Sequence, residues 1–580
     1  MAATSKDSAI KGLDKLYEFE REPVSENKLQ PGKHFAGVFA GEHVAGTEFV
    51  IGALFVTWGA SAFDIFVGLL LGNLMAVLTW TFVCAPIAVQ TRLTLYWYLR
   101  RIAGPVTTTV YNILNAVLFC ILAGCMITVS ASAIRTVIGT ERFPNSGIAP
   151  QVGWIPTDYR FVLIVVVVGA VVVTLAILGF KKLAQFAEVC SPWMFLMFIA
   201  GAIVMLPRLA ANMFDSSRIS SFHDFWELAN KSIWTGIAPE GNPQMTFWHV
   251  AAFAWICNLA MHGGLSDMAL FRYAKRSSYG LYSAFGMYLG HYLAWICAGI
   301  MGAGAALAIG TSLTQLDAGG VAWEALGVAG IVAVVIAGWT TSNPTLYRAG
   351  LAFQAVTPGW PRWLVTLLAG AATTAIACSP FVFTKLLDFV GLYGLLLVPV
   401  GAIVFTEHWI FPKIGLSRFW VSHKKLLVSW PALLSWGIAM LAAFILQKTG
   451  LIHLFFLFVP VWILTTILYI IFASLAGARE KFSEHPAEQT KTEPGPESTE
   501  TQEEPKSVKK GYGKDPILVT CAVVALASLA ACVILPLWVY LSESADYLKY
   551  MVTFKSVLIW PTLIYFVTGT IWIVKRSKVK

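Results

Sequence analysis

Apolar runs of about 20 residues recur along almost the whole chain, separated by short polar segments. A helix needs roughly 20 apolar residues to cross the hydrocarbon core of a bilayer. The pattern therefore predicts an all-α integral membrane protein with about 14 transmembrane helices. We expect the spans at 35–58, 65–90, 108–139, 159–180, 185–207, 246–269, 281–309, 323–343, 363–380, 386–410, 428–448, 452–475, 515–541 and 551–575.

Composition supports a location in the lipid bilayer. Hydrophobic residues make up 57% of the 580 positions and charged residues only 13%, whereas soluble domains carry roughly 25% charged residues. The nine cysteines all lie in apolar runs, so we expect small core residues, not disulfides or zinc ligands. Residues 1–33 lack the apolar centre of a signal peptide, so the first span is expected to act as its own insertion signal.

Basic residues predict the orientation. With a cytoplasmic N-terminus, nearly all basic loop residues fall inside, whereas the outside connections at 310–322, 449–451 and 542–550 carry one lysine between them. This asymmetry is the positive-inside pattern, and it accounts for the net charge of +9 without a nucleic-acid partner. We expect both termini in the cytoplasm and the protein in the plasma (inner) membrane.

Residues 476–514 interrupt the apolar pattern. They are rich in Glu, Pro, Thr and Lys and have almost no apolar residues, a composition typical of disorder. The sequence thus divides into a cytoplasmic segment (1–34), a twelve-helix body (35–475), a disordered cytoplasmic linker (476–514) and two additional spans (515–580).

The first span, HFAGVFAGEHVAGTEFVIGALF, holds several glycines together with Glu42, His43 and Glu48. Charged groups inside a span are costly and point to function, and glycine weakens a helix. We predict a helix broken near Gly41, which would free carbonyls to bind a cation and aim half-helix ends at a ligand. The alternative is a helix start, with Glu42 and His43 at the membrane interface.

The sixth span, FAWICNLAMHGGLSDMALFRYAKR, has a matching interruption around His262 and a Gly-Gly pair. Two interrupted spans five apart are typical of an inverted repeat of five plus five helices. His262 is either a site residue or a satisfied core histidine. Asp267 is expected to cap the helix or to pair with the nearby Arg272.

The eighth span, IVAVVIAGWTTSNPTLYRAGLAF, places Thr340, Thr341 and Asn343 together. Their oxygens suit a monovalent cation, although threonine hydroxyls also bond carbonyls one turn back in their own helix. The chain has no phosphate-binding loop and no HExxH or paired-cysteine motif. We therefore expect neither ATP-driven transport nor an enzyme.

Five segments resemble the nucleobase–cation symporters, the family of cytosine, purine, allantoin and hydantoin permeases. AGWTTSNPTLYRAGLAF resembles the family's eighth helix, and LLLGNLMAVLTW its second. ILGFKKLAQFAEVCSPW is similar to the junction of the fourth and fifth helices, GLSDMALFRYAKR to the end of the sixth, and FVGLYGLLLVPVGAIVFTEHWI to the tenth. The resemblance covers about 35–420.

The resemblance implies ten core helices in two inverted repeats, two peripheral helices, and transport coupled to Na⁺ or H⁺. It also implies a sodium site with Glu42 facing the substrate. The ligands of that ion would be the carbonyls of Val38, Gly41 and Ala337 and the hydroxyls of Thr340 and Thr341.

The expected aromatic positions differ from the family. Leu118 and Leu122 stand where the third helix usually carries an aromatic residue and an amide, and Ala260 stands at the aromatic position of the sixth. Phe119 or Trp255 would have to replace those rings. The substrate-binding prediction is Glu42, His43, Phe119, Ala260, His262 and Asn343.

These features predict a cation-coupled symporter that moves a small nitrogen-rich solute, such as a nucleobase, by alternating access. One alternative is a symporter of the same fold for amino acids or other amines, with Glu42 recognising the amine. An alternative of another class is a membrane sensor that does not transport. The substrate, the coupling ion and the oligomeric state stay open.

Overall fold

The structure is a computed structural model. It describes residues 18–138, 158–214, 218–238, 244–311, 316–379, 381, 386–482, 515–542 and 546–579. Over these ranges the chain is all-α, and the pairing between extended segments is limited to two isolated bridges. The predicted fold class is confirmed in this respect.

The helices follow one another with short connections. Those of the first five spans are α2 (Gly32–His43), α3 (Glu48–Thr57), α4 (Ala62–Thr79), α5 (Ala85–Thr91), α6 (Leu95–Ala103), α7 (Pro105–Ile138), α8 (Tyr159–Ile177) and α9 (Phe180–Met213). The second five contain α10 (Phe222–Leu228), α11 (Phe247–Ile256), α12 (Leu259–His262), α13 (Met268–Phe271), the π-helical turn η5 (Phe285–Tyr292), α14 (Leu293–Ile309), α15 (Ala318–Leu326), α16 (Val328–Gln354), α17 (Arg362–Ala377) and α19 (Leu386–Phe405). The remaining helices are α20 (Trp420–His423), α21 (Trp430–Lys448), α22 (Phe458–Ala473), α23 (Pro516–Tyr540), α24 (Tyr547–Val557) and α25 (Ile559–Val579).

Ten helices of the described chain are long and apolar enough to cross a membrane, and the bent pair α2 and α3 raises the number to eleven. The three other predicted spans, of the fourteen expected, coincide with α11–α13, α16 and α17. α11 and α17 are shorter apolar helices, and α16 carries the polar run from Thr340 to Asn343. Length and composition alone therefore give a lower count than fourteen.

Both predicted helix interruptions are present. α2 and α3 meet at 54° across a break of four residues. The sixth span is divided into α11, α12 and α13, and Leu265 adopts a positive φ of 62° in its second break. Gly401 of α19 packs against this break so closely that a Cβ would lie 1.8 Å from the Gly263 carbonyl oxygen.

The helix contacts repeat when spans 1–5 are exchanged with spans 6–10. Span 6 packs on span 2 through α11 and α4, and span 1 packs on span 7 through α3 and α14. Likewise span 5 packs on span 1 through α9 and α2, and span 10 packs on span 6 through α19 and α12. The pairs α7 with α16 and α8 with α17 map onto themselves. Such a pattern is that of two related halves packed as an inverted repeat.

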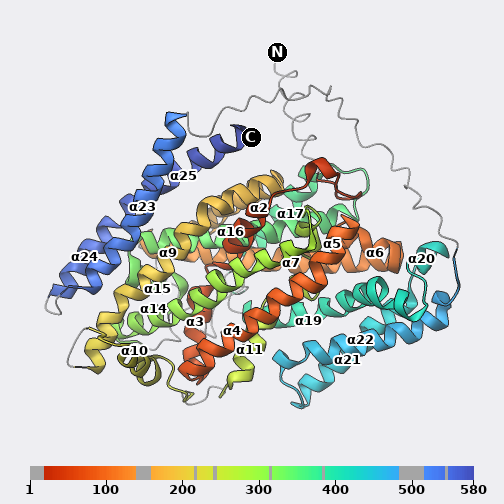
Figure 1. The fold of residues 1–580 in the computed structure, drawn as a ribbon, viewed down its shortest axis with the longest axis horizontal. Coiled ribbons are helices and arrows are strands. Elements are labelled where there is room, and N and C mark those ends of the chain that lie inside the picture. Colours follow the sequence, from red (N-terminus) through yellow and green to blue (C-terminus); the bar gives the residue numbers. More distant parts are fainter. Residues whose placement is uncertain are drawn as a thin grey trace.

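The helices outside this core lie on two sides of it (Figure 1). α21 and α22 pack together beside α19, whereas α23 and α25 pack on α9. Hydrogen bonds cross this second contact: Tyr565 donates to the Val189 carbonyl at 2.7 Å, and the Trp193 indole donates to Thr562 at 3.1 Å. The last two spans therefore pack on the body. Residues 483–514, most of the predicted linker, lie outside the described residues.

Candidate functional site

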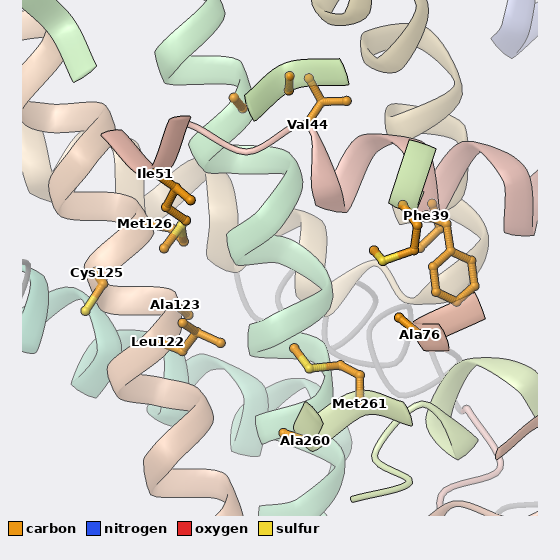
Figure 2. Packing of buried hydrophobic residues seen from close by; sticks show 14 of the residues in the cluster. Phe39, Val44, Ile51, Ala76, Leu122, Ala123, Cys125, Met126, Ala260 and Met261 are labelled. Carbon is orange, nitrogen blue, oxygen red and sulfur yellow. The ribbon is translucent and has the colours of Figure 1, made fainter. Parts of the chain in front are cut away.

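The break in the first span lies one turn after the predicted position. α2 continues through Gly41 and ends at His43, and α3 begins at Glu48. Val44 lies at the start of the connection, and Ala260 and Met261 lie on the short helix α12 (Figure 2). Gly41 stays helical because α9 passes close by, with Ala187 2.9 Å from where a Cβ would stand. The interface alternative does not apply, because Glu42 and His43 are both buried.

One buried arginine occupies both carboxylates nearest the breaks. Arg348 of α16 donates to both oxygens of Glu42, at 2.6 and 3.0 Å. Its Nε and Nη2 also donate to Oδ1 of Asp267, at 2.9 and 2.5 Å. The Trp80 indole donates to the second Asp267 oxygen at 2.6 Å. Two carboxylates thus share one guanidinium, which ties α2 and α16 to the segment just before α13.

This arrangement corrects the expected role of Asp267. The side chain does not pair with Arg272, five residues away, because it is buried against Arg348. Arg272 instead donates to the carbonyl of Phe19 at 2.6 Å and to the hydroxyl of Tyr347 at 3.1 Å. It therefore holds the N-terminal segment against the end of the sixth span.

The threonine pair of the eighth span meets the C-terminal end of α2. Thr341 Oγ1 donates to the carbonyl of Glu42 at 2.7 Å and to that of Ala337 at 3.0 Å. Thr340 Oγ1 also donates to the Ala337 carbonyl, at 3.1 Å. The carbonyl that faces Thr341 is that of Glu42, the residue after the predicted Gly41. Val38 is buried in the same helix.

Three buried imidazoles surround the two breaks. Nδ1 of His43 lies 2.8 Å from the Phe39 carbonyl, and Nε2 of His262 lies 2.8 Å from the Trp255 carbonyl. The third, His291 of η5, has its ring 5.1 Å from that of His43. Each ring keeps one nitrogen without a hydrogen-bond partner among the described residues. Buried polar atoms are rarely left unpaired, so these nitrogens are available to a ligand or to water.

The other predicted residues lie in the same core. The Phe119 ring of α7 meets the edge of the Tyr393 ring, with 6.1 Å between the centroids. Ala260 is fully buried beside α19. Asn343 is fully buried, and neither polar atom of its amide has a partner in the described chain.

A further set of buried polar groups was not predicted from the sequence. The hydroxyls of Tyr96 and Tyr111, the amide of Asn115 and the hydroxyl of Ser266 are buried without a hydrogen-bond partner among the described residues. They face one another, and Tyr96 also interacts electrostatically with Arg348. Only Ser266 stood inside a segment that the sequence singled out, because the others come from α6 and α7.

Comparison with solved structures identifies the fold. The chain matches the nucleobase-cation-symport-1 family transporter MHP1 in a closed conformation with bromovinylhydantoin bound, with a TM-score of 0.60 and 17% identity. This match covers 81% of the chain and 98% of MHP1. The inward-facing conformation of MHP1 matches with a TM-score of 0.57 and 16% identity over 81% and 97% of the two chains.

The chain has this transporter fold. A substrate-bound, outward-open Na⁺-coupled sialic acid symporter matches as well, with a TM-score of 0.55 and 13% identity over 82% and 97% of the two chains. No protein-family model matches the sequence, and no curated protein matches it significantly. The predicted inverted-repeat fold with broken first and sixth spans is thus confirmed.

Proposed function

We propose that this protein is a cation-coupled symporter that moves a small, uncharged, nitrogen-rich solute through the membrane by alternating access. Nucleobases and related ring compounds are the solutes we favour. The observation that carries the proposal is the group of buried, unpaired polar atoms at the breaks of the first and sixth spans. In this fold the breaks are where substrates and ions bind.

The chemistry of these atoms favours an uncharged solute. The unpaired groups of His43, His262 and Asn343 are imidazole nitrogens and an amide, which match the N–H and C=O groups of a planar ring. Phe119 and Tyr393 supply ring surface nearby. Glu42 is a poor receptor for an amine in this arrangement, because Arg348 already occupies both of its oxygens. This argues against the amino-acid alternative.

For the coupling ion we propose sodium at the junction of α2 and α16. Oxygen ligands suit a hard monovalent cation, and the hydroxyls of Thr340 and Thr341 already meet the carbonyls of Ala337 and Glu42. An ion bound there would hold α2 on α16 and favour the substrate-competent arrangement. Such a coupling is typically worth about 1–3 kcal/mol. We propose the same orientation as the sequence predicts, with both termini in the cytoplasm.

Transport by the purified protein in proteoliposomes tests this function. Labelled cytosine, adenine, uracil and allantoin are supplied with and without an inward sodium gradient. We expect at least one of them to accumulate only with the gradient, and failure of all four would refute the nucleobase proposal.

Variants of two threonines test the ion site. Thr341→Ala is expected to weaken sodium dependence at least tenfold. Thr465→Ala is the matched control, because Thr465 of α22 bonds only the carbonyl one turn back, at 2.7 Å. Unchanged sodium dependence in Thr341→Ala would refute this ion site.

A further inference from the structure

The first half of the fold buries a second acidic site, separate from the Arg348 cluster. Glu48 lies in the first turn of α3, and its side chain is 3% exposed. One oxygen accepts a hydrogen bond from the Trp295 indole. The other lies 3.7 Å from Nε2 of His291. No lysine or arginine of the described chain pairs with this carboxylate, unlike Glu42.

The free energy of burial argues against a carboxylate anion here. A buried ion without a partner costs several kcal/mol. Its position at the N-terminus of α3 returns about 0.3–1 kcal/mol, and one hydrogen bond to a charged group adds about 1.5–3 kcal/mol. Protonation removes the charge and makes the carboxyl group a donor toward the unpaired side of the site.

The groups that face Glu48 from the neighbouring helices do not supply a compensating charge. His291 of η5 and Cys257, in the first break of the sixth span, are the titratable side chains that interact with it. α14 and α15 also pack on α3; they carry Cys297, which is buried, and Glu324, which pairs with Lys555.

A path for a proton leads from this site to the breaks. The His291 ring stacks on that of Trp295 at 4.3 Å and lies 5.1 Å from the His43 ring. Nδ1 of His291 has no partner in the described chain. A neutral imidazole can accept a proton at one nitrogen and release one from the other. His291 is therefore placed to connect Glu48 with the space between the two breaks.

We propose that Glu48 binds and releases one proton in each transport cycle, with His291 as the group that passes it on. On uptake, a proton from water forms an O–H bond on the carboxylate, giving the neutral acid seen buried between α3 and α14. On release, that bond breaks and the proton leaves to water on the other side of the membrane. No oxidant, reductant or further reactant takes part. This inference rests on the proposed transport function and adds a proton to the sodium ion.

Solute-driven proton movement tests the coupling. Proteoliposomes containing a pH-sensitive dye receive whichever of cytosine, adenine, uracil or allantoin the wild-type protein exchanges, and internal acidification is followed. Glu48→Gln keeps the side-chain shape and the acceptor for Trp295, and we expect acidification to fall at least tenfold while exchange of the same solute continues. Equal acidification by Glu48→Gln and wild type would overturn the proposal.

Glu407→Gln is the matched control. Glu407 is a fully buried glutamate outside the broken helices, hydrogen-bonded to the hydroxyl of Tyr469 and the backbone of Phe419. Its replacement makes the same chemical change and should leave acidification within twofold of wild type. A tenfold loss in this control as well would mean that any buried glutamate affects coupling, which also contradicts the proposal.

A second measurement does not depend on the solute. The infrared spectrum of the purified protein at neutral pH shows the carbonyl stretch of protonated carboxyl groups. We expect Glu48→Gln to lose the equivalent of one such group per molecule. If all four solutes fail to exchange, the transport function is refuted, and this band still decides the proton site. An unchanged band would show that Glu48 is ionised and overturn the proposal.

Discussion

Replacing Arg348 by methionine should destabilise the protein more than any single change at the surface. The guanidinium makes two hydrogen bonds to Glu42 and two to Asp267, and it is fully buried. Arg348→Met leaves two buried carboxylates side by side with no cation. Breaking a buried ion pair by removing one partner costs about 3–5 kcal/mol. With a factor of ten for every 1.4 kcal/mol, the ratio of folded to unfolded protein falls roughly a hundredfold to several thousandfold.

The companion variants separate charge from packing. Asp267→Asn leaves Glu42 paired with Arg348 and brings the three-residue cluster from a formal charge of −1 to zero, so its cost should be smaller. In the Arg348→Met background, Asp267→Asn should restore part of the lost stability, since it removes one of the two stranded charges. The two sites are in contact, so their effects should not add.

Thermal unfolding in detergent, followed by size-exclusion chromatography, measures these differences. Arg92→Met is the matched control. Arg92 makes one 3.0 Å contact with the exposed Glu26, and such surface pairs contribute about 0–1 kcal/mol. If Arg348→Met unfolds at the same temperature as Arg92→Met, or if Asp267→Asn is the more harmful change, the electrostatic account of this cluster is wrong.

Two further predictions concern single contacts. Trp80→Phe keeps the aromatic ring but removes the indole donor to Asp267; we expect a loss of about 1.5–3 kcal/mol in the same unfolding assay, and a loss below 0.5 kcal/mol would contradict the assigned bond. Near the C-terminus, a hydrogen bond from Lys575 holds the pKa of Asp515 below its usual value. This contact therefore stabilises the protein at neutral pH and is lost as the pH falls through the lowered pKa. In Asp515→Asn the acid-induced loss of stability should be smaller than in wild type, and an identical pH profile would refute the link.

The sequence predicted the parts of the site that are encoded locally. Glycines among polar residues in an apolar run weaken a helix where they stand, and both breaks were found within a turn or so of Gly41 and Gly263. The threonine pair was recognisable for the same reason, because neighbouring residues define it. The resemblance of five short motifs in order also predicted the fold.

The Arg348 cluster could not be predicted in this way. Its partners lie 81 and 306 residues away, and one sequence contains no direct information on which distant charges meet. Asp267 was assigned to Arg272 on sequence proximity alone. A usable signal was present, since an arginine in the apolar run LYRAGLAF requires a buried anion or water. Tyr96 and Tyr111 carried no such signal, because tyrosine is ordinary at the ends of apolar helices.

The packing of the last two spans on α9 has a consequence for how the protein senses its lipid environment. α9 contains Pro192 and Pro207 within its length, and prolines are the usual places where a helix bends. α23 and α25 cover part of this helix, and Tyr547 and Tyr565 hold on to its carbonyls at 2.8 and 2.7 Å. Any bending of α9 therefore occurs partly against a protein surface, not against fluid acyl chains. The rate of such a movement would then depend less on bilayer thickness and fluidity than it would in a transporter whose fifth helix faces the lipid.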